Sequence, residues 1–175
     1  MAYEELIIGA GSEWETLVLD ARSHASWSQP FGRRLSGHPE RIFWHHSVYP
    51  VKDLDPDEQL KWLVSTIPSG TYGWPYNFVA WPGESATTLW YLNDVDEHHA
   101  HTYGNNNQVA ICAHGNYETT EPPKHLVAAM WHLTGALQVM WGAQLEVLPH
   151  RAVYATACPG IHLAAELEEL TDGAA

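Results

Sequence analysis

Hydrophobic positions along the chain fall into short apolar runs and into runs with helical spacing. The spacing of three and four predicts helices over residues 55–67, 122–142 and 161–170. The short runs predict strands over residues 6–8, 17–19, 42–45, 76–81, 87–92, 109–113 and 145–148. Because strands and helices alternate through most of the chain, we expect an α/β fold. It would be a single domain with a central mixed β-sheet flanked by about three helices.

The predicted helices have recognisable ends. Asp55 can cap the first helix and Pro56 suits its first position, with acidic residues in the first turn. Prolines at 122 and 123 begin the longest helix and Gly142 ends it. The residues expected to form the buried stripe of that helix are Leu126, Met130, Leu133, Leu137 and Met140.

The pattern divides the chain into three parts. Residues 1–40 form an N-terminal extension packed on the domain, with a hairpin or two short edge strands followed by a long ordered loop over residues 21–40. Residues 41–170 form the main domain, which would carry any chemistry. Residues 171–175 are a tail that we expect to fray.

Composition and charge exclude some classes of partner and of stabilising device. The chain has 175 residues, 45% of them hydrophobic, which suits one domain with a sizeable core. A formal charge of −13 argues against a nucleic-acid partner, since phosphate binding needs clustered Lys and Arg. No apolar window is long enough for a membrane span, so we expect no membrane insertion, and the N-terminus does not resemble a secretory signal. With two cysteines, a disulfide framework is not the stabilising device.

The clearest candidate chemistry lies in the segment HRAVYATACPG at residues 150–160. It places His150 and Cys158 on one irregular segment, which can fold back and bring both side chains to one point. Histidine nitrogen and cysteine sulfur together suit Zn²⁺. The best third donor is His45 or His46 in the apolar run RIFWHHS at residues 41–47. Only one of these two neighbours can face a metal, because adjacent strand residues point to opposite sides.

Four segments, taken together, resemble a known family. They are FWHHS at residues 43–47, WPYNFV at 74–79, NNNQVAICAHGN at 105–116 and HRAVYATACPG at 150–160. In this order they are similar to the motifs of the zinc-dependent N-acetylmuramoyl-L-alanine amidases. That family includes the peptidoglycan recognition proteins and the phage-lysozyme type. The resemblance covers roughly residues 40–170, indicates a phage endolysin and implies the family fold, a mixed sheet with about three helices.

The resemblance implies a single Zn²⁺ held by His45, His150 and Cys158, with a fourth position left for water. His45 is preferred over His46 on this ground, and His46 would be structural. The implied reaction is hydrolysis of the amide bond between N-acetylmuramic acid and the L-alanine of the stem peptide. Tyr76 would orient the water and donate to the developing oxyanion, and Thr156 would add a hydrogen bond to it.

Further residues are candidates for contact with the substrate. The resemblance indicates His99 in the substrate groove, with His101 as an alternative, and Asn107 near the start of a strand. Trp74 could stack on a sugar ring, and Arg151 could meet the acidic stem peptide. The partner would be bacterial peptidoglycan, and we expect a monomer. The protein would be made in the host cytoplasm and act on the cell wall after release.

Several alternatives remain open. Proteins of this family can bind peptidoglycan without cutting it, usually after losing the cysteine or the tyrosine, and this chain keeps both. A purely structural zinc domain would unfold on chelation. A bridge between Cys112 and Cys158 would compete with the zinc site, although Cys112 lies in a run typical of core. A second metal at the histidine cluster of residues 98–101 lacks convincing partners.

Overall fold

The structure is a computed structural model, and its described residues cover most of the chain. They are residues 4–8 (backbone only), 16–24, 39–67, 74–95, 102, 107–141 and 145–173. The histidine cluster at 98–101 and most of the loop predicted at 21–40 lie outside them. Within the described residues no helix has the length and apolar character needed to span a membrane.

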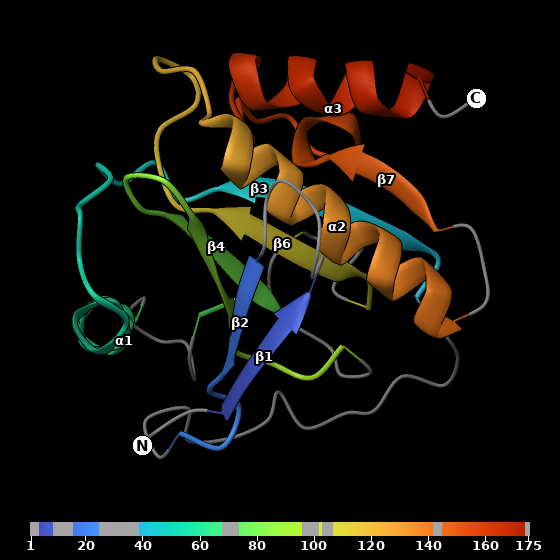
Figure 1. The fold of residues 1–175 in the computed structure, drawn as a ribbon. Helices are drawn as coiled ribbons and strands as arrows, with labels where there is room; N and C mark the ends of the chain where they lie inside the picture. Colours follow the sequence, from blue (N-terminus) through green and yellow to red (C-terminus); the bar gives the residue numbers. More distant parts are fainter. Residues whose placement is uncertain are drawn as a thin grey trace.

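A mixed sheet forms the centre of the molecule (Figure 1). Within the described residues it has seven strands in the order β1-β2-β5-β4-β6-β3-β7. Their bounds are β1 Glu4–Ile8, β2 Thr16–Asp20, β3 Arg41–His46, β4 Phe78–Pro82, β5 Thr87–Tyr91, β6 Val109–Ala113 and β7 Glu146–Pro149. β1 with β2 and β4 with β5 pair antiparallel, and the other four pairings are parallel. The sheet confirms the predicted fold class.

Helices cover both faces of the sheet. They are α1 Pro56–Ser65, α2 Lys124–Trp141 and α3 Ile161–Gly173, and a short 3₁₀ turn, η1 His150–Ala152, follows β7. α2 and α3 pack on one face in a core that includes Ile42, Trp44 and Ile111. α1 packs on the other face, where Leu60 and Leu63 join a second core. Figure 1 shows α2 running across the central strands with α3 beside it.

The first helix begins as predicted. Asp55 caps it by accepting from the Glu58 backbone N–H at 2.9 Å, while the Glu58 carboxylate accepts from the Asp55 N–H at 3.2 Å. This reciprocal pair satisfies two backbone donors at the helix start, and Pro56 occupies the first turn, where its missing N–H costs nothing. The sequence signal and the structure agree here because capping is a local interaction.

The longest helix differs from its prediction at one position. Leu126, Met130, Leu133 and Leu137 are buried as expected. Met140 is 56% exposed, so its assignment to the buried stripe is wrong. It lies in the last turn of α2, where the neighbouring Val139 is also exposed, so the core ends before the helix does.

The N-terminal segment contributes to the sheet itself. β1 and β2 pair antiparallel, as the predicted hairpin requires. β2 then pairs parallel with β5 from Leu17 against Thr88 to Asp20 against Tyr91. Arg22 fixes this junction by bonding the carboxylates of Asp20 and Asp94 and lying 4.1 Å above the Tyr91 ring centre. The boundary placed at residue 40 remains a prediction.

Candidate metal centre

Three side chains from distant parts of the chain meet at one point. His45 comes from the carboxyl end of β3, His150 begins η1 after β7, and Cys158 lies in the turn before α3. One donor atom from each lies within 4.8 Å of the others, and in the described part of the chain this is the one group of three or more such side chains that could hold a metal ion. The parallel pairing of β3 with β7 carries His150 to the same end of the sheet as His45.

Strand geometry separates the two neighbouring histidines. Trp44 packs in the core under α2, so His45 projects to the opposite face, the one that α1 covers. The His45 Nδ1 atom lies 3.6 Å from the Cys158 sulfur. His46 instead accepts a hydrogen bond at Nδ1 from the Tyr117 backbone N–H at 3.2 Å. His46 is therefore a structural residue, and His45 belongs to the centre.

Backbone hydrogen bonds close the segment that carries the other two donors. The Arg151 N–H donates to the Cys158 carbonyl at 2.9 Å and so joins the two ends of the loop. The Cys158 N–H donates to the Thr156 hydroxyl oxygen at 3.2 Å. Gly160 ends the segment with φ +92 and lies against the Tyr117 backbone, where a Cβ would come within 2.3 Å of the Tyr117 carbonyl carbon. Glycine is required there because both its φ and its close approach exclude a side chain.

The donor set fits a zinc ion. Ordinary Zn–N and Zn–S bonds at a tetrahedral angle place a nitrogen and a sulfur about 3.6 Å apart. The separation of His45 Nδ1 and Cys158 Sγ matches that value at 3.6 Å. Both ring nitrogens of His150 are buried without a hydrogen-bond partner among the described residues. A buried imidazole without partners is costly, and a metal bond would satisfy one of its nitrogens.

The electrostatics of the donors point the same way. Burial lowers the pKa of His150, which keeps the imidazole in the neutral form that a ligand needs. Burial raises the pKa of the Cys158 thiol to about 11, and the His46 backbone N–H, 3.4 Å from the sulfur, opposes part of that rise. A thiolate at this position therefore needs a nearby cation, which a metal ion would provide.

Tyr76 lies beside the centre, in an irregular segment rather than in the predicted strand. Its ring centre is 5.0 Å from that of His45. Burial raises the pKa of its hydroxyl well above the ordinary value, with the thiols of Cys112 and Cys158 adding to the effect. The hydroxyl therefore keeps its proton at neutral pH and can act as a hydrogen-bond donor.

Cys112 belongs to the surroundings of the centre, which the sequence did not indicate. In the register of β3 with β6 it lies directly opposite His45, and it is fully buried. Both Cys112 and Cys158 are free thiols, which excludes the disulfide alternative in this structure. The alternation of β6 could have placed Cys112 on the face of His45, but only the pairing of the strands shows that the two are neighbours.

The candidate substrate residues are scattered. Trp74 is 3% exposed and its indole N–H donates to the Leu63 carbonyl at 2.8 Å, so a sugar could reach it only if its neighbours moved. The Arg151 side chain is exposed and lies 3.4 Å from the Glu168 carboxylate on α3. Asn107 is exposed in the turn before β6, at the opposite end of that strand from Cys112. His99 and its alternative at residue 101 lie outside the described residues.

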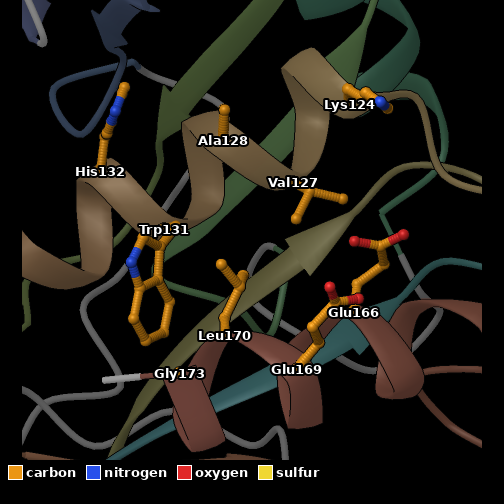
Figure 2. Close-up of a pocket in the computed structure, with 9 residues that line it drawn as sticks. All are labelled: Lys124, Val127, Ala128, Trp131, His132, Glu166, Glu169, Leu170 and Gly173. Atoms are coloured by element: carbon orange, nitrogen blue, oxygen red, sulfur yellow. The ribbon is translucent and has the colours of Figure 1, made fainter.

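A groove of about 740 Å³ lies elsewhere, between α2 and α3 (Figure 2). Its floor is apolar, with Val127, Trp131 and Leu170, and Glu166 and Glu169 of α3 line its rim. The groove is on the face opposite the metal centre and contains none of the three donors. The groove is therefore separate from the candidate metal centre.

The fold and the centre together define a class of protein: a single mixed α/β sheet with a two-histidine, one-cysteine centre at the end of a parallel strand. No protein-family model matches the sequence, and no curated protein matches it either. Solved structures do match, and they are peptidoglycan recognition proteins and phage or bacterial N-acetylmuramoyl-L-alanine amidases.

Three of these structures illustrate the likeness. Drosophila PGRP-LB has a TM-score of 0.72 at 24% identity, covering 87% of this chain and 93% of its own. An endolysin from a Thermus scotoductus bacteriophage has 0.65 at 18%, covering 85% and 97%. The amidase LysC of Clostridium intestinale has 0.58 at 20%, covering 78% and 86%. The chain therefore has the fold of this group, which confirms at the level of fold the resemblance found in the four sequence segments.

Proposed function

We propose that the protein is a zinc-dependent N-acetylmuramoyl-L-alanine amidase that acts on bacterial peptidoglycan. The observation that carries the proposal is the meeting of His45, His150 and Cys158 around one point. Two nitrogens and a sulfur would hold a zinc ion through three protein ligands and would leave room for water, as in catalytic rather than structural zinc sites. The likeness in fold to amidases and endolysins supports the same proposal.

Each residue of the centre has a role in the proposed reaction. His45, His150 and Cys158 would hold the zinc ion. When bound, zinc supplies a Lewis acid for the amide carbonyl and a water of lowered pKa. The backbone N–H of His46 donates toward the Cys158 sulfur and would stabilise the thiolate that serves as ligand.

Two hydroxyls would act on the reacting amide. Tyr76 keeps its proton because its pKa is raised, so it would orient the water and donate to the oxygen on which negative charge develops. Thr156 uses its oxygen as an acceptor for the Cys158 N–H, which leaves its own proton available for the same oxygen. A neutral hydroxyl adds no positive charge, so the contribution of Thr156 would be the smaller one.

The substrate contacts belong to the same proposal. Arg151 would meet the acidic stem peptide after exchanging its ion pair with Glu168, which is exposed and therefore weak. His99, Asn107 and Trp74 remain sequence-based candidates for contact with other parts of the substrate. The protein would act as a monomer on the cell wall.

The decisive experiment combines metal analysis with product analysis. The purified protein is loaded with zinc and incubated with cell walls. The new carboxyl groups on N-acetylmuramic acid and the new amino termini on L-alanine are then measured. We expect one zinc per chain and new L-alanine termini. His150→Asn should lose both. His162→Asn is the matched control: His162 lies on α3 and pairs with Glu121, which precedes α2, so this variant should keep both the zinc and the new termini.

Other outcomes identify the alternatives. Binding to cell walls without new termini would refute the amidase and favour a recognition module. Zinc removal that abolishes the folded state, rather than activity alone, would favour a structural metal site. A protein that takes up no zinc would remove the basis of the proposal.

A further inference from the structure

Tyr154 is an exposed aromatic residue at the edge of the metal centre. Its ring lies nearly parallel to that of His150, at an angle of 18° and a centroid distance of 5.7 Å. The residue is 52% exposed, although the ring packs against a proposed metal ligand. The Tyr154 N–H donates to the His150 carbonyl at 3.3 Å, so the backbone of the turn holds the ring in this position.

The fold does not account for this side chain. The large rings that build the two cores, such as Trp44, Trp81 and Trp90, are fully buried. Tyr154 belongs to neither core cluster. A single exposed tyrosine is common on protein surfaces and proves nothing by itself. Its place is what distinguishes it, because the exposed ring stacks on His150, one of the three proposed metal ligands.

The chemistry of the proposed substrate fits such a ring. In a muramyl peptide the amide to be cut is joined to the sugar through only the lactyl carbon and an ether oxygen. When that amide lies at the metal centre, the pyranose must lie within about one ring width of it. Tyr154 is at that range from His150, at 5.7 Å between ring centres. The C–H faces of a pyranose pack well on an aromatic ring, which combines apolar area with a polar edge.

We propose that Tyr154 is a substrate-contact residue that binds the N-acetylmuramic acid ring beside the scissile amide. This inference rests on the proposed function, since it names the part of the substrate that one side chain of the same site recognises. It predicts that the protein distinguishes a sugar-bearing substrate from the same lactyl peptide without the sugar. The competing interpretation is that Tyr154 only positions His150. In that case, loss of Tyr154 would weaken the binding of both compounds equally.

The test compares two uncleavable ligands on the zinc-loaded protein. Each carries the lactyl group and stem peptide with a methylene in place of the scissile carbonyl, and only one carries the N-acetylmuramic acid ring. Dissociation constants are measured by calorimetry for the wild type, Tyr154→Ala, Tyr154→Phe and Val153→Ala. Val153 is the matched control, because it is exposed on the same turn and lacks a ring. Zinc content is measured for every variant.

We expect the wild type to bind the sugar-bearing ligand about 10-fold more tightly, the scale of one good aromatic contact. Tyr154→Ala should lose this preference, while Tyr154→Phe and Val153→Ala keep it, with zinc content unchanged. Equal weakening of both ligands by Tyr154→Ala, or a preference that survives it, would overturn the inference and leave the amidase proposal standing. A wild type that binds neither ligand and cuts no cell wall would remove the proposed function as well.

Discussion

His114 is a buried histidine whose protonation should destabilise the folded protein. It is 0% exposed, its ring stacks on Trp81 at 3.8 Å, and it is not a donor of the metal centre. Its Nδ1 lies 3.1 Å from the Ser47 hydroxyl oxygen, which already accepts from the N–H groups of Gly115 and Tyr49. The Ser47 proton is therefore directed at Nδ1, so the ring is neutral and carries its proton on Nε2.

The size of this loss of stability follows from the shift of the His114 pKa. Burial lowers the pKa of His114 from 6.5 to about 4, with the Pro50 carbonyl opposing the shift and Lys52 adding to it. Between these two values the unfolded chain binds a proton that the folded chain does not, so stability falls as the pH falls from 6.5 towards 4. Linkage gives a loss of about 2 kcal/mol between pH 8 and pH 5 from this residue alone.

The assay is urea unfolding at pH 8 and at pH 5, with excess zinc in both. His114→Phe keeps a ring against Trp81 and removes the titration. The variant should be less stable at pH 8, because it loses the Ser47 hydrogen bond. Its further loss on going to pH 5 should be smaller than that of the wild type by about 2 kcal/mol. Equal losses in the two proteins would refute the argument, because titration elsewhere would then explain the acid sensitivity.

Three substitutions test the local structure by urea unfolding. Gly160→Ala should lower the free energy of unfolding by about 3 kcal/mol or more, because the new Cβ would lie 2.3 Å from the Tyr117 backbone and the residue has φ +92. A loss below about 1 kcal/mol would contradict this. Asn77→Ala should cost about 2 kcal/mol or more, because the buried Ala110 N–H loses its acceptor at 2.9 Å; an unchanged midpoint would contradict it. Val48→Asn should stabilise the protein by about 1 kcal/mol, because valine is strained at φ 64 and asparagine tolerates it; destabilisation would show that no strain is relieved.

Local signals made much of the fold predictable. The cap of α1, the apolar run of β6 and the prolines before α2 depend on neighbouring residues, and the structure follows these signals to within a few positions. Met140 was misassigned because helical spacing does not show where a core ends. The strand predicted from Tyr76 begins at Phe78, because Tyr76 precedes the paired residues while its ring reaches the centre.

The centre itself was predictable only in part, and the reason is strand pairing. Spacing could relate His150 to Cys158 because one loop contains both, closed by the bond from the Arg151 N–H to the Cys158 carbonyl. Spacing could not relate either of them to His45, which is more than a hundred residues away in the sequence. The parallel pairing of β3 with β7 makes that connection.

Strand pairing also decides which residues surround the centre. The pairing of β3 with β6 sets Cys112 opposite His45, so the strand that carries the candidate ligand also positions the buried Cys112 thiol. A shift of one residue in that register would send His45 into the core under α2 and turn His46 towards Cys158. The buried Trp44, which occupies that core, prevents the shift, so the packing of the opposite face determines which histidine can bind a metal.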